Sequence, residues 1–405
     1  MKDTDIFQQA LGLVSPWQVK SSTFDINLKQ LDIVLSFAAG SKFTCPSCKQ
    51  SGLSIHDTIE KKWRHLNFFQ HEAYLVAKVP RIRCNECGVR MVEVPWSRSG
   101  SGFTLLFEAM ILTLAKAMPV KTIGEFVNEH DTRLWRIIHH YVDLGLERTD
   151  HSTVKEVGFD ETSSKRGHNY VSLFVDIDGP RVLFATEGKD ASTVTRFKEN
   201  LIKHGGEESN IKEMCCDMSP AFIKGVETNF PKAGLTFDKF HIIKVINEAV
   251  DKVRREEQKE HPELVKSRYV WLKNPENLTQ KQSDKLQGLT LKRLNLKTSR
   301  AYQIKLNFQA LFNQPLDTSE AFLKKWFFWA THSRLQPIID AAYTIKRHWD
   351  GVLNWFQSRL NNGILEGLNS LIQAAKAKAR GYRTNKNFIA MIYLIGGKLN
   401  FELPT

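Results

Sequence analysis

Two close pairs of cysteines stand in the first quarter of the sequence. Cys45 and Cys48 form one C-x-x-C pair, and Cys84 and Cys87 form the other, with 35 residues between the pairs. A C-x-x-C turn directs two thiolates at one ion, and zinc prefers four such ligands in a tetrahedron. We therefore expect one structural Zn²⁺. The alternative is two redox pairs or incidental buried cysteines, although a redox site of the thioredoxin kind needs only one pair.

Three carboxylates, far apart along the chain, could form a second metal site. Asp160 directly follows a β-rich segment, Asp217 directly follows a hydrophobic strand pattern, and Glu366 lies in the first turn of a predicted helix. Ligands of open α/β sheets gather outside the carboxyl ends of strands, and carboxylate oxygens suit Mg²⁺. The alternative is that the two aspartates only end strands, as Asp often does. A shared site requires the strands of Asp160 and Asp217 to be neighbours, which the residue pattern alone does not establish.

The segment 151–241 has the composition of an α/β sheet that could hold these acids. Short β-rich runs alternate with turns and one helical stretch, and the predicted strands are 154–159, 170–176, 182–186, 211–216 and 235–237. Three strands in a row, followed by alternating helix and strand, predict a sheet of mixed direction. Asp160 then ends the first strand and Asp217 the fourth. Behind Asp217, Ser219 and Pro220 predict a helix start that is capped by the serine hydroxyl.

A helix predicted over 364–380 carries the third acid. Glu366 lies on a polar stripe of this helix, together with Asn369, Ser370 and Gln373. A run of cations without an intervening acid follows this stripe: Lys376, Lys378, Arg380, Arg383 and Lys386. Such a run beside a metal site suits the phosphate backbone of DNA. A solvated helix face is the alternative.

Helical spacing over 103–146 indicates a helix-turn-helix after the cysteine segment. The apolar face of its first helix is expected to be Leu105, Leu106, Ala109, Leu112 and Leu114. Pro119 interrupts the pattern, and Asp131 can cap the amino end of the last helix. The exposed face of that helix offers these residues to a DNA groove: Arg133, Arg136, His139 and His140. A plain helical linker is the alternative interpretation.

The charge of the chain favours nucleic acid as a partner. The 405 residues carry a formal net charge of +13, and each cation that meets a phosphate releases condensed counterions. This length exceeds what one core usually organises, so roughly two to four domains are expected. No run of 18 apolar residues and no signal-peptide pattern occurs, and we expect a cytoplasmic protein associated with the nucleoid.

Five short strings stand in a distinctive order: 158–161 (GFDE), 216–219 (CDMS), 237–241 (FDKFH), 366–369 (EGLN) and 379–383 (ARGYR). Together with the two cysteine pairs, they resemble DDE transposases of the ISL3 family of bacterial insertion sequences. The resemblance spans nearly the whole chain in the family's order. It is specific, since five strings and two cysteine pairs would otherwise have to coincide by chance.

The resemblance implies a multidomain α+β chain with five parts. These are an amino-terminal zinc ribbon domain (1–102), a helix-turn-helix DNA-binding domain (103–150), the first part of an RNase H-like α/β catalytic core (151–241), a large α-helical insertion (242–361), and the last catalytic helix with a basic tail (362–405). The resemblance makes Asp160, Asp217 and Glu366 the metal-binding triad. It gives Asp238 and His241 a supporting role near the metals or the DNA.

The expected insertion combines helical apolar spacing with many cations. From Lys239 to Lys305, 16 Lys or Arg residues stand against 8 Asp or Glu residues. The aromatic cluster at 326–329 (WFFW) could stack on splayed bases, but its helical spacing is more typical of a core. Cys215 and Cys216, just before the insertion, are likewise expected in a core and not at a metal.

With this resemblance, the expected activity is the transposition of an insertion sequence. The protein would bind terminal inverted repeats, free a 3′ hydroxyl with water, and join that hydroxyl to target DNA. Two Mg²⁺ (or Mn²⁺) ions roughly 3.5 to 4 Å apart would serve both steps. A homodimer on paired DNA ends is expected. The alternatives are an inactive DNA-binding regulator derived from a transposase and an RNase H-like nuclease without strand transfer.

Overall fold

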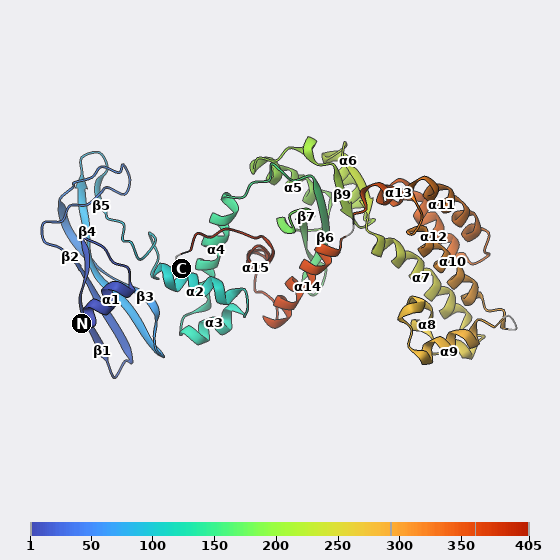
Figure 1. Cartoon of the computed structure of the whole chain (residues 1–405), viewed down its shortest axis with the longest axis horizontal. Coiled ribbons are helices and arrows are strands. Elements are labelled where there is room, and N and C mark those ends of the chain that lie inside the picture. Colours follow the sequence, from blue (N-terminus) through green and yellow to red (C-terminus); the bar gives the residue numbers. More distant parts are fainter. Residues whose placement is uncertain (1, 292–293, 361, 404–405) are drawn as a thin grey trace. The chain divides into compact units, whose positions relative to one another are not determined.

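The computed structural model describes residues 2–291, 294–360 and 362–403, which form two compact units. Unit 1 comprises Met1–Arg148, Ala374–Leu394 and Leu399–Thr405, and unit 2 comprises Thr149–Gln373 and Ile395–Lys398. Figure 1 labels the helices and strands along the chain. Each unit has a hydrophobic core of its own.

A five-stranded sheet carries the cysteine pairs in unit 1. After the short helix α1 (Asp3–Ala10), its strands follow the order β1 (Trp17–Asp25), β2 (Gln30–Phe37), β4 (His71–Cys84) and β3 (Ile55–Phe68), and β5 (Gly88–Met91) pairs with β4. Most of the segment between the cysteine pairs forms a hairpin of β3 and β4. Trp63 lies in the core of the sheet, whereas Phe69 at the hairpin turn is 80% exposed. β1 and β2 widen the ribbon into a domain with its own core.

Three helices follow this sheet in unit 1: α2 (Leu105–Ala115), α3 (Val120–Val127) and α4 (Asp131–Glu147). The predicted leucine face of α2 is wrong, and its buried residues are Phe107, Glu108, Ile111, Leu112 and Ala115. Because this helix is apolar on nearly every side, spacing alone does not select a face. The cap predicted at Asp131 is wrong by one residue, since the ring of His130 accepts the hydrogen bond from the amide of Thr132.

A second five-stranded sheet forms the centre of unit 2. Its order is β10 (Gly234–Phe237), β9 (Glu213–Cys216), β6 (Glu156–Lys165), β7 (Asn169–Asp176) and β8 (Arg181–Glu187). β6, β7 and β8 pair in antiparallel fashion, whereas β9 and β10 add in parallel beside β6. This is the sheet of mixed direction that the sequence predicts. It also makes β6 and β9 neighbours, as a site shared by the two strands requires.

β6 is longer than predicted, and this changes the position of Asp160. The predicted strand ends at residue 159, but β6 continues to Lys165 because it pairs with β7 as far as Asn169. The polar residues after Asp160 favour a strand only weakly, and cross-strand pairing overrides that weakness. Asp160 therefore does not end the strand. It lies two residues beyond Gly158, the last residue of β6 that pairs with β9.

Helices complete unit 2 around this sheet. They are α5 (Ala191–Lys203), α6 (Pro220–Asn229), α7 (Lys239–Glu257), α8 (Arg268–Leu272), α9 (Gln280–Leu289), α10 (Lys297–Leu311), α11 (Leu316–Thr331), α12 (Gln336–Arg347) and α13 (Trp349–Ser358). Single 3₁₀ turns lie at Glu208–Asn210, Pro262–Leu264 and Pro275–Asn277. α14 (Gly363–Lys378) begins in unit 2 and ends in unit 1, and α15 (Asn385–Gly396) follows it.

The apolar core of the sheet continues into the helices between α7 and α13. Trp326 belongs to this core, and its indole N–H donates to the carbonyl of Ile304 at 3.0 Å, whereas Phe328 and Trp329 are exposed. The core interpretation of the aromatic cluster thus holds for only part of it. Cys215 and Cys216 are buried in the core, as predicted. None of the described helices is both long and apolar enough to span a membrane.

Candidate active site and DNA-binding surfaces

Three aspartates lie at the same level on neighbouring strands of unit 2: Asp217 and Asp238 directly follow β9 and β10, whereas Asp160 lies within β6. The parallel pairing of β6 with β9, and of β9 with β10, sets the register of the three strands. One or two residues beyond the last pairs, this register brings Asp160, Asp217 and Asp238 side by side across strands about 4.8 Å apart. The amide of Asp238 donates to the carbonyl of Cys216 at 2.9 Å, which extends the pairing to this level.

Asp160 lies on the face of β6 that contacts α14. Side chains alternate along a strand, so Gly158, Asp160 and Thr162 share one face. Gln373 of α14 donates from Nε2 to Thr162 Oγ1 at 2.6 Å. At the other end, Asn362 Oδ1 lies 3.1 Å from the position that a Cβ on Gly158 would take. The segment from Asn362 to Gln373 therefore runs along the face that carries Asp160.

Glu366 lies on the side of α14 that makes these two contacts. Asn362, Glu366 and Gln373 are four and seven residues apart, which places them on one stripe of a helix. Asp160 is two residues, about 7 Å, along the strand from Gly158, and Glu366 is four residues, about 6 Å, along the helix from Asn362. Since Asn362 Oδ1 lies close to Gly158, these rises predict that the two acids lie at about the same level. Figure 1 shows α14 beside β6 in unit 2.

The carboxylates of Asp160, Asp217 and Glu366 do not come close enough together to form a ready-made metal site. Among the residues that the structure describes, the cysteine set is the one group of three or more metal-binding side chains whose ligand atoms all lie within 4.8 Å of one another. Acids at short range repel one another, and a divalent cation would offset that repulsion. Carboxylate oxygens at strand ends, with Glu366 exposed, are the hard donors that such a cation prefers.

Burial raises the pKa of Asp160 and of Asp238 at this sheet edge. It raises the pKa of Asp160 to about 7, and the charges of Glu161, Asp217 and Asp238 act in the same direction. The amide of Glu161 donates to Asp160 Oδ1 at 2.8 Å and opposes this rise in pKa. Burial also raises the pKa of Asp238. A proton and a cation would therefore compete for Asp160 near neutral pH.

Glu161 is a further acid at this edge that the residue patterns do not single out. Burial and then the charge of Asp217 raise its pKa, while Lys189 and His241 oppose the rise. Strand alternation puts its side chain on the other face of β6 from Asp160. The one sequence signal for Glu161 is its place beside Asp160 in the 158–161 string.

Asp217 is held where β9 passes into α6. Its Oδ1 accepts a hydrogen bond from the amide of Ser219 at 2.9 Å. Ser219 is the cap residue and Pro220 the first residue of α6, as predicted, but the predicted cap bond from the serine hydroxyl is absent. Asp217 bonds the amide of Ser219 itself and not a first-turn amide that a capping hydroxyl would accept from, and nothing in the structure explains the missing cap bond.

Asp238 and His241 lie where β10 passes into α7. Asp238 Oδ1 accepts from the amide of Phe240 at 3.3 Å and caps α7, and His241 Nε2 is 3.9 Å from Asp238 Oδ2. Of the pair predicted to act in support, Asp238 is thus itself one of the three aspartates at this level, and His241 lies next to it.

The four predicted zinc ligands meet in unit 1. The Sγ atoms of Cys45, Cys48, Cys84 and Cys87 all lie within 4.8 Å of one another, and none of them forms a disulfide. Cys84 is the last residue of β4, and Cys87 lies in the turn to β5. A hydrogen bond from the amide of Cys48 lowers the pKa of Cys45 to about 7, which favours the thiolate. Four sulfur donors at this spacing fit tetrahedral zinc.

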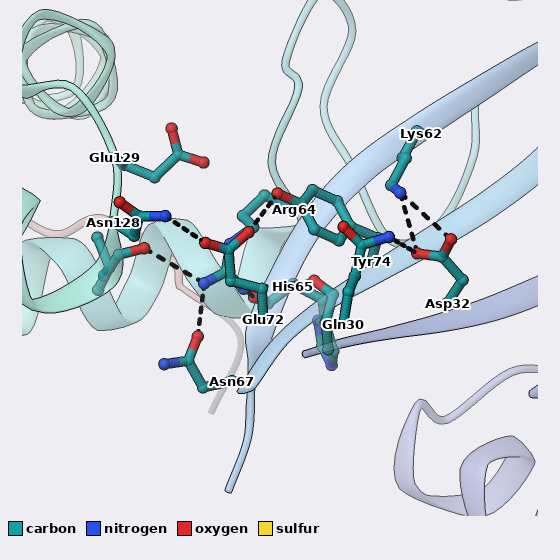
Figure 2. A network of polar contacts seen from close by, with 12 residues as sticks. Gln30, Asp32, Lys62, Arg64, His65, Asn67, Glu72, Tyr74, Asn128 and Glu129 are labelled. Carbon is teal, nitrogen blue, oxygen red and sulfur yellow. Dashed lines mark hydrogen bonds and ion pairs between the residues drawn. The ribbon is translucent and has the colours of Figure 1, made fainter. Parts of the chain in front are cut away.

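A buried arginine joins the β3–β4 hairpin to the turn between α3 and α4 in unit 1. Arg64 Nη2 donates to the carbonyl of Val127, the last residue of α3, at 3.3 Å. Glu72 accepts from Asn128 Nδ2 at 2.6 Å and from the Tyr74 hydroxyl at 2.7 Å (Figure 2). Sheet and turn are thus bonded to each other, which gives α4 a defined orientation on the ribbon domain.

Three of the four residues predicted on the exposed face of α4 are exposed, and His139 is not. Arg133, Arg136 and His140 are exposed, as expected of a helix that reads DNA. His139 instead bonds through Nε2 to Asn387 Oδ1 at 2.9 Å, because residues 374–394 pack against α4 within unit 1. His139 is half-buried, so the prediction that it belongs to the exposed face of this helix is wrong.

The basic run at the end of α14 belongs to unit 1, together with the helix-turn-helix. Lys378 Nζ donates to the carbonyl of Ala117 at 2.6 Å, and Lys376 Nζ lies 5.9 Å from the centre of the Phe388 ring. The exposed members of the run are Lys378, Arg380, Arg383 and Lys386. Exposed cations of this kind can meet phosphates.

Three family models match successive parts of the chain. Residues 41–87 match the zinc finger of transposases IS204, IS1001, IS1096 and IS1165, residues 92–142 match the helix-turn-helix domain of transposase family ISL3, and residues 157–392 match the DDE transposase model of ISL3. The chain is 26% identical over 364 residues to the transposase for insertion sequence element IS1557 of Mycobacterium tuberculosis, covering 82% of this chain and 81% of that protein. It is 24% identical over 357 residues to the transposase for IS1001 of Bordetella parapertussis, covering 86% and 87%.

Proposed function

Because this chain belongs to the ISL3 family of insertion-sequence transposases, enzymes that act on DNA, we propose that Asp160, Asp217 and Glu366 hold the divalent ions with which it cuts and joins DNA. The observation that carries the proposal is the pair of contacts that bracket Asp160 on β6 and Glu366 on α14. The common level of Asp160 and Asp217 in the sheet supports it further.

The proposed reaction is two successive attacks on phosphodiester bonds. In the first attack, the oxygen of water bonds to phosphorus at the end of the element, the bond from phosphorus to the 3′ oxygen breaks, and a 3′ hydroxyl is freed. In the second attack, that hydroxyl bonds to a phosphorus of target DNA and displaces a 3′ oxygen there. Two Mg²⁺ or Mn²⁺ ions about 3.5 to 4 Å apart would supply the charge that activates the attacking oxygen and stabilises the leaving one.

The three side chains act in this scheme as ligands and not as nucleophiles. Asp160 and Asp217 come from the sheet, whose paired strands hold them rigidly, and Glu366 comes from a helix anchored on the same face. Rigid elements of this kind preserve the geometry that metal-dependent chemistry needs. Asp238 and His241 support the site without binding metal, and one structural Zn²⁺ occupies the cysteine set.

The DNA-binding residues and the assembly are also proposals. The cations proposed to meet DNA phosphates are Arg133, Arg136, Lys376, Lys378, Arg380, Arg383 and Lys386. The DNA would be the terminal inverted repeats of the element and its target, bound by a homodimer that pairs two ends. We retain as proposals the domain boundaries 1–102, 103–150, 151–241, 242–361 and 362–405.

A cleavage and joining assay tests the active site. Purified full-length protein is incubated with paired terminal-repeat DNA and Mn²⁺, and both cut and joined products are measured. The variant Asp217→Ala should lose at least about 1000-fold in cleavage, since it removes a ligand of the reacting ions. Its affinity for the DNA ends should stay within about 3-fold, a change of less than 1 kcal/mol. Cleavage at the unchanged rate would refute the assignment, and cutting without joining would show a nuclease.

A further inference from the structure

The chain leaves the sheet at Asp238 and returns to it at Asn362, and these two residues are bonded to each other. The backbone N–H of Asn362 donates to the carboxylate of Asp238. The same carboxylate caps α7 through the amide of Phe240, at 3.3 Å. One side chain therefore holds both the first helix after the sheet and the residue that precedes α14.

We call the place where the chain leaves the sheet at Asp238 and returns at Asn362 the neck. Further hydrogen bonds join the sheet to the returning chain at the neck, but they reach α13 and not α14. Thr236 of β10 bonds through its hydroxyl to Ser358 Oγ at 2.9 Å and accepts from Asn354 Nδ2 at 2.9 Å. Asn354 also donates to Glu213 Oε2 at 2.8 Å. Among these polar contacts, the bond to Asp238 is the one that concerns the amino end of α14.

Asp238 differs from Asp160 and Asp217 in its burial and in the hydrogen bonds that its carboxylate accepts. It is 3% exposed, whereas Asp160 and Asp217 are half-buried. Two backbone N–H groups donate to its carboxylate, and His241 Nε2 lies 3.9 Å from Oδ2. These donors occupy about two of the roughly four lone-pair sites of the carboxylate, and its burial leaves the other sites less open to an ion than those of Asp160 and Asp217.

The position of Asn362 determines the position of Glu366. The two residues are one helical turn apart on the same stripe of α14, and Asn362 meets Gly158 on the face that carries Asp160. A displacement of about 1 Å at a reacting centre can cost about 100-fold in rate. A bond that holds Asn362 against the sheet therefore bears directly on Glu366.

We propose that Asp238 is a positioning residue, which fastens the amino end of α14 to the sheet and so sets Glu366 opposite Asp160. This inference rests on the proposed function, since it gives Asp238 a role at the same metal site. Asp238 also caps α7, so the helices between α7 and α13 are bonded at their neck to the helix of Glu366.

Full-length variants at Asp238 test the proposal. Asp238→Asn keeps an acceptor oxygen and the shape of the side chain, and Asn caps helices about as well as Asp. It should cleave within about 10-fold of the unchanged protein, with the same Mn²⁺ concentration for half-maximal rate, whereas Asp238→Ala should lose about 100-fold. If Asp238→Asn is as inactive as Asp217→Asn, or needs several-fold more Mn²⁺, Asp238 is a ligand and the proposal is overturned. Full activity of Asp238→Ala also overturns it.

Thr236→Val is the matched control at the same neck. It removes the hydrogen bonds to α13 but leaves α14 bonded, so it should lower the urea midpoint of unfolding without changing the cleavage rate. A loss of cleavage as large as that of Asp238→Ala would attribute the effect to a weakened neck and overturn the proposal. If Asp238→Ala does not fold, the comparison of Asp238→Asn with Asp217→Asn decides. An Asp217→Asn protein that cuts DNA would instead refute the proposed active site itself.

Discussion

Asp160, Asp217 and Asp238 have the same side chain at the same edge of one sheet, and their surroundings give them different capacities. The carboxylates of Asp160 and Asp217 each accept a hydrogen bond from an amide one or two residues ahead, and both remain partly open. Asp238 is enclosed by N–H donors from two elements. In our proposal, local backbone contacts and not residue type separate the metal ligands Asp160 and Asp217 from the positioning residue Asp238.

The hydrogen bonds of Gln373 join α14 to β6, and a substitution at Gln373 tests whether the cleavage rate depends on them. Leucine at this position keeps the size of the side chain but removes the hydrogen bonds to Thr162 Oγ1 and to the carbonyl of Ser163. Because Glu366 would then shift, we expect Gln373→Leu to lower cleavage about 10-fold or more. The free energy of unfolding should fall by about 1 kcal/mol. Single-turnover cleavage and urea unfolding measure the two effects.

Gln336→Leu is the control for that variant. Gln336 donates to Asp340 Oδ1 in the exposed first turn of α12, at 2.8 Å. Its loss removes a hydrogen bond of the same kind without touching the sheet. Equal losses of cleavage in the two variants would contradict a special role of Gln373.

His151 makes the protein less stable in acid. It is 2% exposed, and burial lowers its pKa to about 4. In the unfolded chain His151 is protonated as the pH falls below about 6.5, whereas in the folded chain it is protonated only below about pH 4. The stability contributed by neutral His151 is therefore complete above about pH 6.5 and falls by up to about 3 kcal/mol as the pH drops through this window.

Urea midpoints at pH 7 and pH 5 measure this dependence. His151→Gln should make this dependence shallower, because the variant has no group that titrates at that position, while His65, whose pKa burial also lowers to about 4, keeps part of it. His56→Gln, at an exposed position of β3, should leave the dependence unchanged. A slope that stays equally steep in His151→Gln would show that another group is responsible.

At the scale of elements, the turn between α3 and α4 depends on a glycine. A Cβ on Gly124 would lie 2.6 Å from the carbonyl oxygen of Glu129, which is a backbone atom and cannot rotate away. Asn128 ends α3 in the left-handed region, with φ 54°. The close approach of α3 to this turn directs α4, and Asn128 also bonds to Glu72 of the sheet (Figure 2).

Gly124→Ala should therefore damage DNA binding through the turn. We expect the free energy of unfolding to fall by about 1 to 3 kcal/mol, the usual cost of forcing extra volume into a packed site. Affinity for terminal-repeat DNA, measured by gel shift, should fall as well. Gly288→Ala in α9 is the control, since a Cβ there meets nothing within 4 Å, and it should be neutral or stabilise by up to about 1 kcal/mol. Similar effects of both substitutions would exclude a role of the close approach.

At the scale of the whole molecule, the two proposed metal sites lie in different units. The cysteine set belongs to unit 1, and the level aspartates belong to unit 2. The two units have separate cores. Loss of one metal should therefore affect one unit first.

Removing zinc should unfold the ribbon sheet and spare the catalytic sheet. Chelation, or Cys84→Ala, is expected to abolish hydrogen-exchange protection across β3 and β4 while β6 and β9 stay protected, because structural zinc supplies folding free energy to small domains. Zinc content should fall from one ion per chain to none. Cys215→Ala, in the core of unit 2, should keep the full zinc content. Protection that survives chelation in both units would contradict a structural role of the ion.

Local patterns were enough to predict the zinc ligands and the helix-turn-helix. A C-x-x-C pair brings two ligands together within one turn, and the three helices follow from apolar spacing over few residues. The five strings added the acids that we propose for the active site, through their resemblance to a family. Local patterns did not predict the cap of α4 or the buried face of α2. Both depend on which side chains lie next to the helix, and the spacing of apolar residues carries no information about those neighbours.

Tertiary structure decided which of these residues meet. The extension of β6 past Asp160 comes from pairing with β7, and the common level of Asp160 and Asp217 comes from the parallel pairing of β6 with β9. The place of Glu366 depends on contacts such as that between Thr162 and Gln373, which are 211 residues apart. Pairing and packing between distant segments are set by the free energy of the whole fold, so no window of the sequence contains them.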